Sequence, residues 1–299
     1  MTTNTDDKKA SRREWLSAEL WPYETRTVEV DGYTIAYMDE GEGPTLLLVH
    51  DGMWSYVWGQ LIGRLRPRFR VLTLDFPGSG LSPDTDRLAS LEGDARLLEQ
   101  FVTSIGLDRF TVVLHDLGGP VGMGLAVRRP ELVDGLVLVN TFAWPPRSTS
   151  LKLMFGVMKS RPIRWFNTTT NLLPRMTSGR FGIGRHLDLA GRKAFLGGFD
   201  RPTARRRFHD LMGAALSETD YLATVEASLS PNLGEKPVLT MFGSNNDPFG
   251  FQARFRDYFE DVVEMTISRG NHFPMADDPA GVARRIGEWH DVKVSPPRS

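Results

Sequence analysis

Three polar residues stand at the ends of strand-like apolar runs, and together they could carry out nucleophilic catalysis. Asp116, Asp247 and His272 each follow a short run typical of a buried strand. A carboxylate is ionised at neutral pH, so Asp116 could attack a saturated carbon without a base to activate it. A histidine held by a second carboxylate could then act as a general base toward water. The pattern predicts Asp116 as nucleophile, His272 as base and Asp247 as the acid that orients His272.

The segment 114–119, with sequence LHDLGG, has the form of a sharp turn from a strand into a helix. Such a turn lifts one side chain, here Asp116, above the sheet edge, while the following glycines allow close packing. Each residue also has an ordinary structural alternative. Asp116 could cap the next helix, Asp247 before Pro248 could be a turn or cap residue, and His272 could make a structural hydrogen bond. The coincidence of all three at strand ends favours the catalytic interpretation.

Two backbone N–H groups are candidates for an oxyanion hole. The first is Gly52, in the loop after the first buried strand, and the second is Leu117, directly after the proposed nucleophile. The glycine-containing segment 75–80 lacks the full spacing and the lysine of a phosphate loop, so we interpret it as a structural turn. No metal-ligand spacing is present, and the sequence predicts neither a metal nor a cofactor.

Strand and helix patterns alternate along most of the chain. Asp31-Gly32 between two short β-type runs predicts an antiparallel hairpin. The runs after it are almost continuously apolar, as in strands covered on both faces by helices. We therefore expect an α/β fold with a mostly parallel sheet opened by that hairpin. The predicted strands are 25–30, 33–39, 45–50, 70–74, 110–115, 135–140, 237–242 and 262–267; the predicted helices are 54–65, 88–105, 119–128 and 279–290.

One long interval contains no strand pattern. Residues 141–230 are rich in Arg, Met, Phe, Gly and Pro with helical periodicity, and ninety residues are too many for a loop. We predict a helical cap inserted after the sixth strand, a core of residues 23–140 and 231–299, and an N-terminal tail at 1–22, of which the first thirteen residues are expected to be disordered. The insertion has fourteen Lys/Arg against six Asp/Glu, a net charge of +8, and the remainder has −9.

Composition excludes several classes of protein. The 299 residues carry a net charge of −1, without the basic excess expected of a nucleic-acid binder. The chain has no cysteine, so neither a thiolate nucleophile nor a disulfide is possible. Apolar runs are far shorter than the ~20 residues that span a bilayer. The sequence therefore predicts a cytoplasmic protein with no membrane or nucleic-acid partner, and it leaves the oligomeric state open.

The chain resembles the haloalkane dehalogenase branch of the α/β-hydrolase fold over nearly its whole length after the tail. The resemblance implies Asp116 as nucleophile, His272 as base, Asp247 as acid, and a covalent alkyl-enzyme ester that water hydrolyses. It also implies a small apolar or halogenated substrate. The Asn-Thr-x-x-Trp-Pro segment at 140–145 is similar to the subfamily whose acid follows the penultimate strand. The resemblance rests on segments 54–58, 75–82, 115–120, 139–145, 272–274 and 277–279.

The halide-binding positions depart from the family pattern. Members of this family place a tryptophan directly after the nucleophile, where this chain has Leu117. A second halide donor falls on Gly52, in a loop that is one residue short. An anion leaving in a dry pocket needs hydrogen-bond donors. The candidates that could replace them in the leaving-group pocket are Trp54, Trp144, Trp165 and Tyr221.

Two other functions stay open at this stage. The chain also resembles epoxide hydrolases, which share the aspartate nucleophile but usually protonate the leaving oxygen with two cap tyrosines. The insertion contains only Tyr221. A protein that keeps the fold but binds a ligand without turnover is the other alternative. The apolar cap residues that could line the pocket are Met154, Phe155, Met158, Phe166, Leu172 and Leu173.

Overall fold

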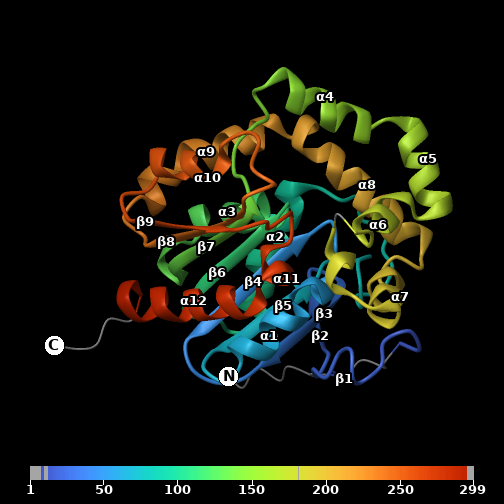
Figure 1. Ribbon diagram of the computed structural model, residues 1–299, viewed down its shortest axis with the longest axis horizontal. Coiled ribbons are helices and arrows are strands. Elements are labelled where there is room, and N and C mark those ends of the chain that lie inside the picture. Colours follow the sequence, from blue (N-terminus) through green and yellow to red (C-terminus); the bar gives the residue numbers. More distant parts are fainter. Residues whose placement is uncertain (1–7, 10–12, 181, 295–299) are drawn as a thin grey trace.

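The computed structural model describes residues 8–9, 13–180 and 182–294 (Figure 1). Its strands are β1 (Lys8–Lys9), β2 (Arg26–Val30), β3 (Tyr33–Glu40), β4 (Thr45–Asp51), β5 (Arg70–Asp75), β6 (Phe110–Asp116), β7 (Val133–Thr141), β8 (Val238–Gly243) and β9 (Val262–Ile267). They form one sheet in the order β1-β2-β3-β5-β4-β6-β7-β8-β9. The pairs β1–β2, β2–β3 and β3–β5 are antiparallel, and the other five neighbouring pairs are parallel. The predicted mostly parallel sheet, opened by an antiparallel hairpin, is confirmed.

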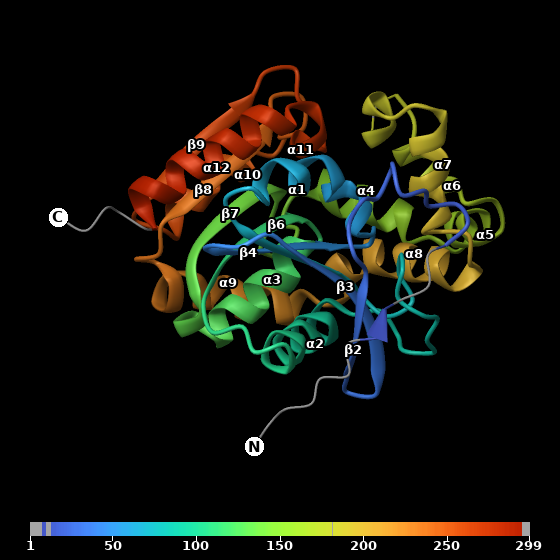
Figure 2. The same cartoon turned by 90° about the horizontal axis from the view of Figure 1, so that it is seen from below.

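Helices cover both faces of the sheet (Figure 2). One face carries α1 (Gly59–Leu65), α11 (Pro274–Asp277) and α12 (Pro279–Lys293), and the other carries α2 (Leu91–Ser104), α3 (Gly118–Arg128) and α9 (Thr219–Leu233). The central strands are buried on both sides by these layers, which explains their unbroken apolar sequences. Shorter elements are α10 (Phe251–Arg254) and the 3₁₀ turns η1 (Ser55–Trp58), η2 (Pro130–Leu132) and η4 (Phe255–Asp257).

The cap is a helical layer above the carboxyl ends of the parallel strands (Figure 1). It follows β7, the sixth of the eight predicted strands. The predicted cap interval 141–230 includes most of α9, which packs against α3 in the core: the Tyr221 hydroxyl donates to the Pro120 carbonyl at 2.8 Å. Its elements are α4 (Thr149–Met158), α5 (Arg161–Thr170), α6 (Leu172–Thr177), η3 (Ile183–His186), α7 (Leu189–Gly197) and α8 (Pro202–Ser217).

The predicted tail is partly structured. Trp15 packs edge-on against Trp54 with ring centroids 5.4 Å apart, and Leu16 and Trp21 are each only 2% exposed. Residues 13–22 are therefore part of the packed structure. Residues 1–7 and 10–12, which the same prediction included, lie outside the described residues.

Buried contacts join the cap to the core. The Trp54 indole N–H donates to the Phe195 carbonyl at 2.9 Å, and Arg201 donates to the carbonyls of Gly80 and Ser82, each at 3.0 Å. The Glu218 carboxylate accepts hydrogen bonds from the first N–H groups of α2, which have no partner within the helix. Among the described helices, none is long and apolar enough to cross a bilayer.

Candidate active site

Asp116 lies on a strained turn at the end of β6. Its φ of +51° is left-handed, a conformation that costs a non-glycine residue about 1–2 kcal/mol. The Thr141 hydroxyl holds the turn by donating to the Asp116 carbonyl at 2.6 Å. The turn also requires Gly118 and Gly119, because a Cβ there would lie 2.2 Å from the Val49 carbonyl oxygen and 1.7 Å from the Thr141 hydroxyl, respectively. The backbone thus raises the Asp116 carboxylate above the sheet edge, as predicted.

His272 follows β9 and faces that carboxylate. Its Nε2 lies 3.3 Å from Asp116 Oδ2, and the two side chains are 30% and 17% exposed, so both remain accessible. Burial alone raises the pKa of Asp116. The charge and hydrogen bond of His272, together with the Leu117 N–H, outweigh burial and lower the pKa of Asp116 below its usual value. Asp116 is therefore held ionised, and the Leu117 N–H donates a hydrogen bond to its carboxylate.

The structure places the side chain of Asn246, and not that of Asp247, within hydrogen-bond distance of His272. The Asn246 side-chain Nδ2 lies 3.1 Å from His272 Nδ1. The Asp247 carboxylate instead accepts hydrogen bonds from the backbone N–H groups of Phe251 at 2.7 Å and Gln252 at 2.9 Å. Those N–H groups at the start of α10 lack helical partners, and both oxygens of Asp247 satisfy them. In this structure Asp247 does not contact His272, and the capping alternative for Asp247 describes its hydrogen bonds.

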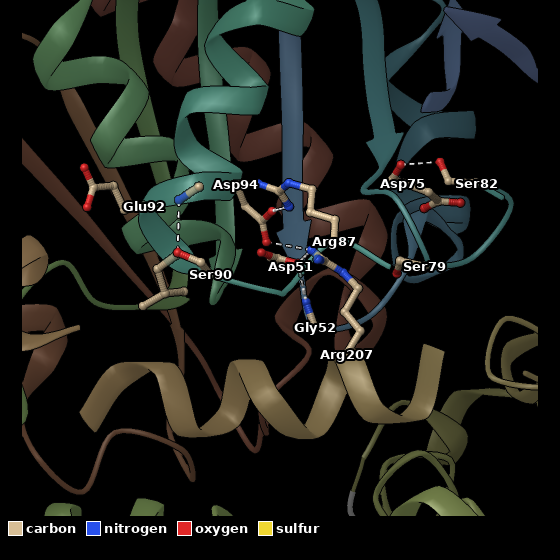
Figure 3. Close-up of polar contacts among 12 residues, drawn as sticks. Asp51, Gly52, Asp75, Ser79, Ser82, Arg87, Ser90, Glu92, Asp94 and Arg207 are labelled. Atoms are coloured by element: carbon tan, nitrogen blue, oxygen red, sulfur yellow. Dashed lines mark hydrogen bonds and ion pairs between the residues drawn. The ribbon is translucent and has the colours of Figure 1, made fainter. Parts of the chain in front are cut away.

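Gly52 also differs from its predicted role. Its N–H donates to its neighbour Asp51 Oδ1 at 2.8 Å, so it is not directed at the Asp116 carboxylate. Asp51 Oδ1 in turn accepts from Arg207 of α8 at 2.8 Å, and the same Arg207 nitrogen donates to Asp94 of α2 at 2.7 Å (Figure 3). Arg87 also forms an ion pair with Asp94. A cation of the cap is thus held between two carboxylates of the core beside the catalytic loop.

The three side chains of this cluster are almost completely shielded from solvent. The side chains of Asp51, Asp94 and Arg207 are 1%, 0% and 6% exposed. Burial raises the pKa of Asp51 well above its usual value, and the positive charge of Arg207 offsets part of that increase. Burial by itself lowers the pKa of Arg207, but Asp94 and Asp51 outweigh it and raise that pKa. The guanidinium therefore stays charged, and its charge favours the ionised form of Asp51.

Two neutral histidines lie beneath the site. Burial lowers the pKa of His50 to about 3 and that of His115 well below its usual value, and the nearby histidines add to the effect in each case. His115 Nε2 is 2.7 Å from the His272 carbonyl oxygen, which can only accept, so this nitrogen carries the proton. His115 thus holds the backbone of His272, and its lowered pKa keeps it neutral.

An apolar cavity of about 360 Å³ opens onto Asp116 and His272. Its volume is within the range of small-molecule sites. Of the predicted cap residues, Met154, Phe155, Met158 and Leu173 line it, whereas Phe166 and Leu172 do not. The other lining residues are Met53, Asn140, Thr141, Phe142, Leu151, Met176, Thr177, Phe208, Met212, Phe242, Asn246, Asp247, Pro248, Phe249 and Phe251.

None of the four aromatic residues predicted for the leaving-group pocket lines this cavity. Trp54 and Tyr221 bond to the backbone carbonyls of Phe195 and Pro120, at the cap–core contact and between α9 and α3. Trp144 is buried beneath the guanidinium of Arg254, 4.3 Å away, and Trp165 is 61% exposed on the outside of α5. Aromatic residues occur both in packed cores and at binding surfaces, so residue type alone does not predict which of them line a pocket.

Sequence reasoning missed Asn246, Asp51 and Arg207. An acidic residue between a buried strand and a glycine was a visible signal at Asp51, but its partner lies 156 residues away in the chain. Asn246 precedes the predicted acid directly, and spacing cannot distinguish two adjacent loop residues. Within the described residues, no three His, Asp or Glu side chains gather as metal ligands would.

The buried cluster leads to a stability prediction. Arg207→Met leaves Asp51 without its counter-charge and should lower the free energy of unfolding at neutral pH by about 3–5 kcal/mol. Asp51→Asn combined with Arg207→Met removes the stranded charge and should recover much of that loss. Denaturant unfolding of the two variants measures both.

The stability of Arg207→Met should also depend on pH. Without Arg207 the folded-state pKa of Asp51 stays above its unfolded value, so protonation stabilises the folded state at acidic pH and this contribution is lost as pH rises through the folded pKa. The loss in free energy of unfolding caused by Arg207→Met should therefore become smaller as the pH falls from about 8 to about 5, the range in which a buried carboxyl group with a raised pKa titrates. If Arg207→Met and the double variant Asp51→Asn with Arg207→Met lost the same free energy of unfolding at every pH, the unpaired charge of Asp51 would not be the cause of the loss.

Comparison with known proteins places this geometry in a family. Residues 46–285 match the family model described as "Alpha/beta hydrolase family". The chain is 31% identical to haloalkane dehalogenase 2 of Mycobacterium tuberculosis (strain ATCC 25618 / H37Rv), over 90% of this chain and 96% of that protein. It is 27% identical to cis-3-alkyl-4-alkyloxetan-2-one decarboxylase of Xanthomonas campestris pv. campestris, over 82% and 88% of the two chains. The structure of haloalkane dehalogenase DbeA from Bradyrhizobium elkani USDA94 superimposes with a TM-score of 0.78 at 20% identity, over 89% of this chain and 96% of that one. The chain therefore belongs to the alpha/beta hydrolase family and is a haloalkane dehalogenase-like hydrolase.

Proposed function

We propose that this protein hydrolyses a carbon–halogen bond of a small apolar substrate through a covalent ester on Asp116. The observation that carries the proposal is the ionised Asp116 carboxylate, raised on its strained turn 3.3 Å from His272 and facing an apolar cavity. The likeness to a haloalkane dehalogenase supports the same reaction. Location in the cytoplasm stays a prediction from the sequence.

The first half of the reaction is a displacement at carbon. An oxygen of Asp116 attacks the carbon that bears the halogen, the carbon–halogen bond breaks, and the halide leaves with the bonding electrons. The apolar walls limit the contact of the carboxylate with water, so the nucleophile is less solvated than it would be in bulk water. This step needs no proton transfer, which suits an aspartate whose pKa is lowered.

The second half is hydrolysis of the ester. His272 Nε2 takes a proton from a water molecule, which attacks the ester carbonyl carbon of Asp116, and the Leu117 N–H stabilises the oxyanion. For this role Nδ1 must carry the other proton and donate it. The Asn246 amide, turned by 180° about its terminal torsion, presents its oxygen to accept that hydrogen bond. Asparagine orients a catalytic histidine in the same way in Cys-His-Asn proteases.

The cavity restricts the leaving group. Among the described residues, neither a tryptophan nor a tyrosine lines it, so no indole or phenol donor faces the departing atom. A poorly stabilised anion in an apolar pocket is costly, and the cost is lower for a larger, more weakly hydrated halide. Bromide and iodide suit this site better than chloride. The same lack of phenols disfavours an epoxide, whose alkoxide needs an acid.

Opening of an oxetan-2-one ring is a second candidate, because it requires no halide donor. If Asp116 attacks the saturated ring carbon that bears oxygen, the ring C–O bond breaks and releases a tethered carboxylate, whose charge is shared between two oxygens. Loss of CO₂ then supplies the electron pair of a new C=C bond and expels Asp116. The relative from Xanthomonas campestris, named as a decarboxylase of such rings, supports this alternative. This route uses no water and no base.

Two variants test the covalent scheme. Asp116→Asn should abolish turnover, because the amide is not a nucleophile toward saturated carbon. His272→Gln should still form the ester on a bromoalkane but fail to hydrolyse it, and intact-protein mass spectrometry should show the added alkyl group. Activity retained by Asp116→Asn together with no adduct in His272→Gln would overturn the scheme.

A matched pair of variants distinguishes the group that orients His272. Asn246→Leu removes the amide and should slow ester hydrolysis by 10²-fold or more, about the effect of losing a base-orienting hydrogen bond, so that the adduct accumulates. Asp247→Asn keeps an oxygen to cap α10 and should leave ester hydrolysis nearly unchanged. The reverse pattern, with accumulation only in Asp247→Asn, would restore the acid predicted from the sequence.

Product analysis separates the candidate reactions. The enzyme should release bromide from 1-bromoalkanes at least about tenfold faster than chloride from matched chloroalkanes, because the cost of the buried anion differs. Oxetan-2-ones and styrene oxide are assayed in parallel for CO₂ and diol. Release of CO₂ with no halide would establish the second candidate, and continued CO₂ release by His272→Gln would show that no water attack is involved.

A further inference from the structure

The first half of the cap has an unusual charge distribution. From residue 135 to residue 187 the chain contains no aspartate or glutamate, yet it contains eight lysines and arginines. These fall on α4, α5, α6 and the segments beside them: Arg147, Lys152, Lys159, Arg161, Arg164, Arg175, Arg180 and Arg185. The positive charge of the cap is thus concentrated in one set of neighbouring helices.

Among the described residues, four of these eight cations have no ion-pair partner. In the part of the chain that the structure describes, Arg147, Arg164 and Arg185 pair with acidic residues from later segments. No ion pair involves Lys152, Lys159, Arg161 or Arg175, and all four side chains are exposed. A surface with unpaired charge of one sign attracts molecules or surfaces of the opposite charge.

The same helices carry most of the large apolar side chains that the described structure leaves exposed. Leu153 and Val157 lie one turn apart on α4, and Trp165 and Phe166 pack edge to face on α5 with centroids 4.9 Å apart. Met154 on α4 and Met176 on α6 are exposed as well. We refer to these six residues and the four unpaired cations as the outer cap face.

We propose that the outer cap face docks peripherally on an anionic phospholipid bilayer. Exposed Trp, Phe and Leu beside Lys and Arg is the composition of helices that lie in the membrane interface, where rings and aliphatic chains enter the head-group region and cations meet lipid phosphates. A second copy of this chain would bring two positive faces together, which like-charge repulsion opposes. The charge therefore selects a lipid surface over self-association.

This inference revises the prediction of no membrane partner. That prediction followed from the lack of long apolar runs, but a peripheral surface needs only exposed side chains and charge. Met154 and Met176 belong both to the outer cap face and to the lining of the active-site cavity. If the proposed function holds, a docked cap therefore places the cavity beside the lipid, from which an apolar substrate could enter. The docking itself does not depend on the reaction.

Vesicle flotation with the full-length chain tests the proposal. The protein should float with vesicles that contain phosphatidylglycerol, should bind phosphatidylcholine vesicles much less, and should be released by about 1 M salt, where the screening length is only ~3 Å. Binding is measured without substrate, so a failure of the proposed reaction cannot affect it.

Two double variants and their controls locate the surface. Lys152→Glu with Arg161→Glu, and Trp165→Ser with Phe166→Ser, should each weaken binding by more than about tenfold, the loss expected for two interfacial side chains. Arg64→Glu with Arg284→Glu changes the net charge equally near α1 and α12, and Leu88→Ser with Val292→Ser removes exposed apolar residues outside the cap; both controls should bind like the wild type. Thermal unfolding verifies that all four variants fold.

Three outcomes would overturn the proposal. The first is no flotation with anionic vesicles at low salt. The second is equal loss of binding in the controls and the cap variants. The third is a wild-type dimer in sedimentation equilibrium that Trp165→Ser with Phe166→Ser dissociates, because the face would then be a contact between copies of the chain.

Discussion

The left-handed backbone of Asp116 is the constraint on which the site depends. A residue at φ +51° turns β6 into α3 within one position, so the carboxylate points away from the sheet while α3 begins against β4 and β7. That geometry leaves no room for a side chain at Gly118 or Gly119, and it needs the hydrogen bond from the Thr141 hydroxyl to the Asp116 carbonyl. The strain is supported by the most buried part of the protein, which keeps the nucleophile in one orientation.

The electrostatics of the site follow from the burial of the titratable groups beneath it. His50 and His115 are neutral because burial penalises their charged forms, so the Asp116–His272 pair faces the cavity without competing charge from below. Apolar walls then strengthen the interactions of this one pair. Among the described residues, neither a tryptophan nor a tyrosine lines the same walls, so the proposed restriction on the leaving group and the proposed reactivity of Asp116 have a common origin.

The sequence predicted the sheet, and it predicted that Asp116 and His272 lie close together, because both follow from the positions of the strand-like runs. Unbroken apolar runs marked strands buried on both faces, and a polar residue at the end of each run had to lie at one sheet edge. The orienting group was different: Asn246 and Asp247 are adjacent, and which of them faces His272 is decided by two unpaired N–H groups of α10 that no pattern reveals. Aromatic residues were misplaced for a similar reason, since Trp54 and Trp144 owe their positions to tertiary partners far away in the chain.

The contact of Arg207 with Asp51 and Asp94 has a consequence for how this fold could be recombined. An inserted cap is often regarded as a module that can be exchanged between relatives to change substrate preference. Here one guanidinium of the cap pairs with two carboxylates of the core, and one of those carboxylates accepts a hydrogen bond from the Gly52 N–H in the loop after β4. If the cap of a relative without an arginine at this position replaced the cap of this protein, Asp51 in the core would be left buried without the guanidinium that it contacts here. Cap and core of this protein are therefore exchangeable only as a matched pair.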